Sequence, residues 1–144
     1  MYQKIRVSLL GAYDLIMAYG AISTGISMIR SSKGVFIEYP NEWLSKVPFE
    51  SWVPPGIIAI ILFGLGNIIA AILSFRVKNK NSWFMSGIMG GIFFISLVSQ
   101  IIILREWYLA TVIFMILSVI QLCLCVYVIA GYRKNLKEAT LLKS

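Results

Sequence analysis

Apolar residues are grouped in four long runs separated by short polar segments, and this pattern predicts four membrane-spanning helices. The runs cover residues 7–29, 55–75, 83–104 and 107–131. Each is close to the roughly 20 residues that a helix needs to cross the hydrocarbon core of a bilayer. The 59% hydrophobic share exceeds the roughly 45–50% of soluble domains, which leaves no room for a separate soluble domain. We therefore expect one all-α domain, a membrane four-helix bundle spanning residues 1–144.

The distribution of basic residues predicts the orientation of the bundle. Nine Lys and Arg residues lie before the first run, between the second and third, and in the tail at 132–144, whereas four lie on the other side. Since basic flanks stay in the cytoplasm, we expect both termini there and the bundle in a cell membrane. The net charge of +7 is then explained by topology and by attraction to lipid headgroups, and we expect no nucleic acid partner.

The long outer loop at 30–54 contains a short amphipathic pattern. Trp43, Leu44 and Val47 share one face of a helical turn, and Phe49 and Trp52 follow. This pattern predicts a short interfacial helix that anchors its apolar face among lipid headgroups. A lid over an outward-facing cavity is the alternative. We favour the anchor, because aromatic interfacial segments are common without a gating role.

Three of the four runs carry a seam of small and polar residues at helical spacing. The seams are Gly11, Asp14, Ala18, Ala21, Gly25 and Met28; Ile60, Gly64, Asn67, Ala71 and Ser74; and Thr111, Phe114, Ser118, Gln121 and Cys125. Small residues let membrane helices approach one another closely. We therefore expect each seam to face the other helices.

The seams place three polar side chains at a similar depth. At the helical rise, Asp14, Asn67 and Gln121 lie roughly 10, 12 and 15 Å from the predicted cytoplasmic ends of their helices. We predict that they form a polar cluster, closed by the glycines of the third run, Gly87, Gly90 and Gly91. Asp14 is expected to be neutral unless water or a cation reaches it. Two interpretations stay open, a packing residue and a site of proton or cation coupling.

A second polar group, Gln100, Arg105 and Glu106, lies near the predicted outer face. Arg105 is within reach of three glutamates of the outer loop, Glu38, Glu42 and Glu50. We interpret these charges as a solvated pair at a helix end, which contributes little to stability.

The sequence carries no pattern typical of catalysis or metal binding. HExxH, GxSxG, P-loop and GxGxxG motifs are missing, and the chain has no histidine. Cys123 and Cys125 are two residues apart, so on a helix they point to different sides and are interpreted as small core residues. We therefore expect no cofactor and no metal, and nothing in the sequence argues for an enzyme.

Two resemblances bear on the fold. The run from Pro48 to Ile58, PFESWVPPGII, resembles a segment of small four-helix bacterial membrane proteins of unassigned function. This resemblance implies a fold and a location, without an activity. Four short spans with an acid in the first are similar to the small multidrug resistance exporters. That family has a glutamate and very short loops, where this chain has Asp14 and a long aromatic loop.

Three classes of function follow from these features. The leading hypothesis is a non-catalytic accessory, scaffold or immunity-type protein that binds another membrane protein, and a dry, filled bundle favours it. The second is a proton-coupled carrier of a small or lipophilic molecule, which a cavity reaching Asp14 favours. The third is a lipid-binding protein whose outer-leaflet cavity is roofed by Trp43, Phe49 and Trp52. An apolar groove that opens sideways into the outer leaflet favours this third class.

Overall fold

The computed structural model describes residues 2–32, 41–76, 81–107 and 109–143, and this part of the chain is helical apart from short connections. Its elements are α1 (Tyr2–Ser32), the 3-10 helix η1 (Asn41–Lys46), α2 (Val53–Ile58), the π-helix η2 (Ala59–Leu65), α3 (Gly66–Phe75), α4 (Phe84–Leu104) and α5 (Leu109–Leu141). Since α2, η2 and α3 follow one another directly, they form one long helical segment. The resulting four segments are each long and apolar enough to cross a membrane, which confirms the prediction of an all-helical chain with four long apolar segments.

The observed helices differ from the predicted spans at their ends and at one internal site. Helix α1 already begins at Tyr2, and α5 continues to Leu141, so most of the predicted tail is helical. The tail contains three Lys and three Leu residues, which are good helix formers. The second span contains the π-helical stretch η2, which the apolar pattern did not indicate.

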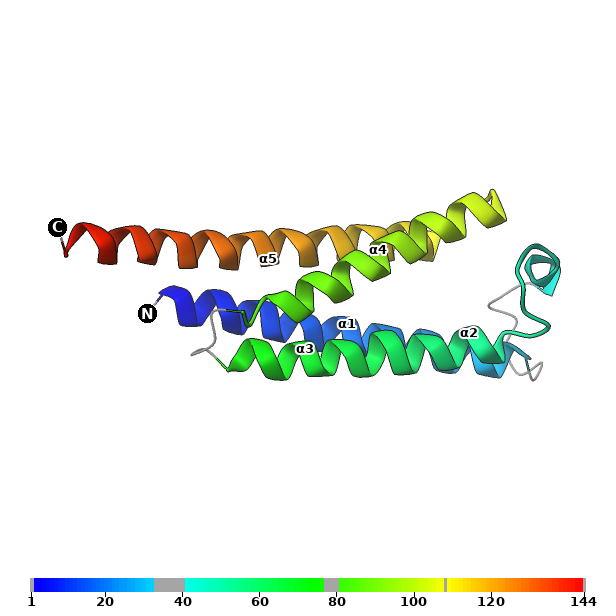
Figure 1. Cartoon of the computed structure of the whole chain (residues 1–144). Coiled ribbons are helices and arrows are strands. Elements are labelled where there is room, and N and C mark those ends of the chain that lie inside the picture. The colour runs from blue at the N-terminus through cyan, green and yellow to red at the C-terminus, as the bar shows by residue number, and fades with distance from the viewer. Residues whose placement is uncertain (1, 33–40, 77–80, 108, 144) are drawn as a thin grey trace.

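The four segments form two layers (Figure 1). Helix α1 and the α2–η2–α3 segment make one layer, and α4 and α5 make the other. Both termini lie at one end, here called the terminal end, and η1 and the α4–α5 connection lie at the other, here called the loop end. Helix α4 starts beside α3 at the terminal end and diverges from that layer toward the loop end. The two layers are therefore further apart at the loop end.

The predicted seams face the interior of the bundle. In α1, the residues from Gly11 to Gly25 in the seam are buried, and Met28 is half-buried. Helices α1 and α2 approach one another closely, and a Cβ atom added to Gly25 would lie 2.6 Å from the carbonyl oxygen of Gly56. Two backbones can meet so closely only because neither residue has a side chain.

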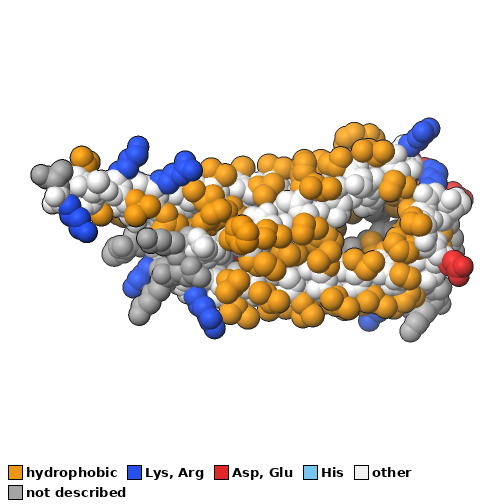
Figure 2. Space-filling model, in the orientation of Figure 1, with side chains coloured by type: hydrophobic (Ala, Val, Ile, Leu, Met, Phe, Trp, Pro, Cys, Tyr) orange, Lys and Arg blue, Asp and Glu red, His pale blue; other side chains and the backbone are white. Residues whose placement is uncertain are grey.

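The surface of the bundle is apolar along its length. Exposed isoleucines, leucines and phenylalanines cover the middle of the helices, whereas Lys and Arg side chains gather toward the ends (Figure 2). This distribution is the one that a bilayer requires of a spanning bundle. The buried residues form separate clusters along the axis, among them Val7, Leu10, Cys125 and Val128 in the terminal half and Trp43, Trp52 and Leu104 at the loop end.

Candidate functional site

Asp14 lies at the centre of a buried polar cluster to which all four helical segments contribute. The structure brings the three predicted side chains together: Gln121 Nε2 donates to Asp14 Oδ1 at 2.7 Å and to Asn67 Oδ1 at 2.8 Å. Each of the three residues is at most 1% exposed. One amide group of α5 thus joins α1 to α3.

Two serines complete the cluster, and sequence reasoning did not include them in it. Ser86 of α4 donates to Asp14 Oδ2 at 2.5 Å, and Ser74 of α3 donates to the same atom at 3.4 Å. The two hydroxyl oxygens are 3.2 Å apart. Ser74 belongs to the predicted seam of its helix, whereas Ser86 lies in the run for which the sequence showed no seam.

The donors around Asp14 suit a carboxylate. Its two oxygens accept hydrogen bonds from one amide and two hydroxyl groups. The ion pair that the described residues show, Lys46 with Glu106, lies elsewhere. The described hydrogen-bond partners of Asp14 are therefore neutral donors.

The glycines expected to close the cluster do so only in part. Gly90 is buried, and a Cβ atom added there would lie 3.2 Å from Gln121 Oε1. Gln121 Oε1 itself is buried and has no hydrogen-bond partner among the described residues. A Cβ atom on Gly91 would meet nothing within 4 Å, and one on Gly87 would meet Trp83 and Cys125. The contribution of α4 to the cluster is thus the Ser86 hydroxyl rather than a surface of three glycines.

A cavity of about 490 Å³ lies between the two layers toward the loop end. This volume is within the range of about 300–1,000 Å³ that is typical of small-molecule sites. Its walls come from all four helical segments and include Met28, Ile58, Leu97 and Ala110. The wall is mostly apolar, and its polar side chains are Thr24, Ser96, Ser99, Gln100 and Thr111. The divergence of α4 from α2 creates this space, and the apolar pattern of the sequence did not reveal it.

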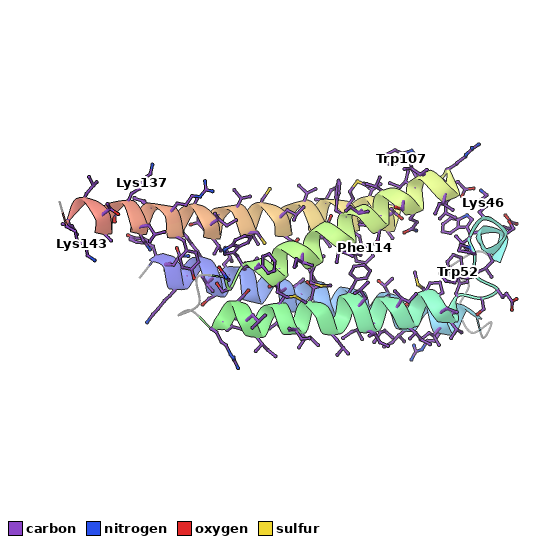
Figure 3. The ribbon with its side chains drawn as sticks, in the orientation of Figure 1. Lys46, Trp52, Trp107, Phe114, Lys137 and Lys143 are labelled. Atoms are coloured by element: carbon purple, nitrogen blue, oxygen red, sulfur yellow. The ribbon has the colours of Figure 1, made fainter. Side chains whose placement is uncertain are left out.

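Three phenylalanines form the floor of the cavity. The ring centroids of Phe63 and Phe93 are 4.8 Å apart, and those of Phe93 and Phe114 are 5.8 Å apart. Figure 3 shows Phe114 projecting from α5 into the space between the layers. Of the described residues that line the cavity, none belongs to the Asp14 cluster. The cavity therefore ends at the aromatic floor.

The cavity opens to the side of the bundle. Ile58, Ile95 and Ile103 line it and are at the same time 46%, 66% and 46% exposed on the helix surface. Figure 2 shows a hollow between the two layers near the loop end. This opening faces the direction in which a spanning bundle meets lipid.

Residues between η1 and α2 cover the cavity at the loop end. Val47, Phe49 and Trp52 line the cavity on the side of the loop end. Trp43 is only 7% exposed and packs in a cluster with Trp52 and Leu104, against which Leu44 and Val47 also pack. The face that we expected to meet lipid headgroups thus meets protein, because the open loop end offers these side chains an apolar surface.

Hydrogen bonds hold η1 against the α4–α5 connection. Trp43 Nε1 donates to Glu106 Oε2 at 2.9 Å, and Lys46 Nζ donates to Glu106 Oε1 and to the Leu104 carbonyl oxygen, both at 3.1 Å. The hydrogen bond from Lys46, and after it the one from Trp43, lowers the pKa of the Glu106 carboxyl. These hydrogen bonds join η1 to the residues at the end of α4 and just after it.

The remaining predicted residues of this end have different partners from those expected. Gln100 Nε2 donates to Thr111 Oγ1 at 3.4 Å on the cavity wall. Arg105 caps α4 with a left-handed backbone, φ 53°, and its side chain is exposed. The observed ion pair joins Lys46 to Glu106, which reverses the predicted pairing of loop glutamates with Arg105. The short α4–α5 connection places Glu106, the residue after Arg105, beside η1. Glu38 lies outside the described residues.

Comparison with known proteins adds no relative. No protein-family model, no curated protein and no solved structure matches this chain. The described residues contain no group of three or more His, Cys, Asp or Glu side chains placed to hold a metal ion. The cavity and the Asp14 cluster are therefore the features from which function is argued.

Proposed function

We propose that the protein binds one acyl chain, which enters the cavity sideways from the bilayer. The observation that carries this proposal is an apolar cavity of about 490 Å³ that opens between α2 and α4 on the lipid-facing side of the bundle. Lipid is already as apolar as the cavity wall, so the hydrophobic effect contributes little to this transfer. Affinity comes instead from the dispersion contacts that an empty cavity lacks.

The polar groups of the wall favour a ligand with one polar end. Thr24, Gln100 and Thr111 bring hydroxyl and amide groups to a surface that is otherwise apolar. A few placed polar groups orient a ligand in such pockets. A fatty acid and a membrane glycerolipid share this chemistry, a flexible chain that ends in a carboxyl or ester group.

We also propose that the terminal end faces the cytoplasm of a bacterial cell. The excess of nine basic residues over four supports this orientation. The cavity then lies in the outer leaflet, and η1 lies at the level of the outer headgroups. In this arrangement η1 borders the interface, and the residues that follow it, Val47, Phe49 and Trp52, roof the cavity.

The two other classes have less support. A non-catalytic partner of another membrane protein was expected to be a filled bundle, and the loop half of this bundle is hollow. A proton-coupled carrier was expected to have a cavity that reaches Asp14, and the floor of Phe63, Phe93 and Phe114 lies between them. Both classes stay as hypotheses that the experiment below separates from lipid binding.

Native mass spectrometry of the purified protein tests the proposal. We expect the wild type to carry one acyl-chain molecule, whose mass distinguishes a fatty acid from a glycerolipid. Ala110→Phe fills the cavity from α5, whereas Ala130→Phe adds the same group to an exposed position of the same helix. The first variant should lose the bound molecule and the second should keep it. Equal occupancy in both variants, or none in the wild type, would exclude binding in this cavity.

A further inference from the structure

We propose that Asp14 controls the floor of the cavity through Gln121 and Asn67, so that ligand affinity depends on the ionisation of Asp14. This inference rests on the proposed function, since it assigns a regulation to the same cavity. In this proposal Gln121 and Asn67 are positioning residues that act on the ligand through Phe63.

An unbroken series of hydrogen bonds connects the acid to the floor. Gln121 Nε2 has two hydrogens, and they bind Asp14 Oδ1 at 2.7 Å and Asn67 Oδ1 at 2.8 Å. Asn67 Nδ2 in turn donates to the backbone carbonyl oxygen of Phe63 at 2.7 Å. Because both hydrogens of the Gln121 amide group are in use, its position responds to any change in either acceptor.

The carbonyl group at the end of this series lies in the π-helical stretch of the second span. Phe63 is a residue of η2, and its ring packs on Phe93 as part of the floor. Single π-helical turns depart from the regular α-helical hydrogen-bond pattern and often occur at functional sites. Asn67 supplies a side-chain donor at this irregular place. A shift of Asn67 therefore reaches the backbone that carries the floor ring.

Ionisation of Asp14 changes the first bond of the series. A carboxylate accepts from Gln121, Ser74 and Ser86, and hydrogen bonds to a charged acceptor are about twice as strong as neutral ones. A proton on Oδ2 would make Ser86 an acceptor and would weaken the Gln121 bond. The ionised form therefore holds Asn67 and Phe63 more firmly than the neutral form does.

Asp14 is the one carboxyl group among the described residues of the cluster, so a change from neutral to acidic pH acts on the cluster through this residue. Helix α3 presents Asn67 and Ser74, and α4 presents Ser86, none of which titrates in this range. Helix α5 presents Gln121 and the thiol of Cys125, which interacts with the Asp14 charge. Thiols titrate above neutral pH. Acidification should thus loosen the floor and lower the affinity for the ligand.

Fluorescence quenching of Trp52 tests the proposal, since this side chain lines the cavity. The other three tryptophans are replaced by phenylalanine: Trp43, Trp83 and Trp107. The probe is a monoacylglycerol brominated at mid-chain, whose own charge does not change with pH. We expect its affinity in detergent to fall at least about fivefold, the lower range of typical coupling between sites, from neutral to acidic pH.

Two variants separate the possible outcomes. Asp14→Asn keeps the size and the hydrogen-bonding capacity of the side chain, and Asn67→Leu removes the link to Phe63 while Asp14 still titrates. Both should bind the probe with an affinity that no longer depends on pH. A pH dependence that persists in either variant would overturn the proposal and would point to Glu106 at the roof. Binding that is independent of pH in the wild type overturns the coupling alone, whereas failure to bind at any pH overturns the proposed function with it.

Discussion

Replacing Gln121 by leucine removes the one side chain that joins α1, α3 and α5 in the polar cluster. The variant loses the hydrogen bonds of 2.7 Å to Asp14 Oδ1 and 2.8 Å to Asn67 Oδ1. Leucine has a similar volume and adds no polar atom, so the perturbation is confined to these two bonds and to the buried Oε1 atom. The expected result is a less stable bundle.

The size of the loss follows from the behaviour of polar groups in membranes. Interhelical hydrogen bonds there average about 0.6 kcal/mol and reach about 1.7 kcal/mol, because the unfolded chain in lipid also finds partners. Two short bonds, one of them to a carboxyl group, lie toward the upper part of this range. The removal of Gln121 Oε1, which has no partner among the described residues, offsets some of the cost. We therefore expect a loss of about 1–2 kcal/mol.

The assay is reversible unfolding in mixed micelles, followed by circular dichroism. Gln100→Leu is the matched control, because Gln100 makes one longer bond of 3.4 Å to Thr111 on the cavity wall. This control should lose no more than about 0.6 kcal/mol. A Gln121→Leu variant as stable as the control would refute the view that the cluster holds the helices together. The double variant Asp14→Asn with Gln121→Leu should lose an amount of unfolding free energy that differs from the sum of the two single losses, since the two side chains are in direct contact.

Two further predictions concern the packing of α1 and the roof of the cavity. Gly25→Ala should destabilise the bundle by about 1–3 kcal/mol, because the new Cβ atom would lie 2.5 Å from Ile60 and 2.6 Å from the Gly56 carbonyl oxygen. Gly91→Ala, where nothing lies within 4 Å of the Cβ position, should instead be neutral or stabilising by up to about 1 kcal/mol, and the same unfolding assay compares the two. Because the pKa of Glu106 is lowered in the folded protein, its carboxylate stabilises the fold at every pH above the unfolded pKa. This stabilisation is lost as the pH falls through the folded pKa. The emission of Trp43 should therefore shift in acid as η1 loosens, and Glu106→Gln should abolish this shift; an unchanged shift in that variant would contradict the role given to Glu106.

The four spans and their inward faces could be predicted because membrane helices impose a simple pattern. Long apolar runs set the number of segments, and small residues at helical spacing set the face. Asp14, Asn67 and Gln121 could be placed at one depth because the rise per residue fixes the position along a straight helix. These three side chains then come into contact if the seams of their helices all face the centre of the bundle.

The sequence offered a cavity roofed by Trp43, Phe49 and Trp52 only as one alternative, because the presence of a cavity depends on how the helices cross. Helix α4 has small residues on several sides, including Ser86, Gly90 and Gly91, so no periodic face showed which part would meet Asp14. Its divergence from α2 opens the cavity, and that angle is set by packing between helices rather than by the pattern within one. At the loop end, Trp43 and Trp52 then pack against other residues of the protein. The amphipathic turn taken alone predicts contact with lipid instead.

Photocrosslinking with a diazirine-bearing fatty acid in lipid nanodiscs tests the central claim, an acyl chain in the lateral cavity, most directly. We expect saturable labelling at cavity residues such as Phe93, Thr111 and Phe114, competed by unlabelled fatty acid and removed by Ala110→Phe. Labelling of Ile69 and Ile120, which are exposed outside the cavity, should rise linearly with the probe concentration. Labelling at the cavity residues that follows the same linear course, with no competition, would contradict the account.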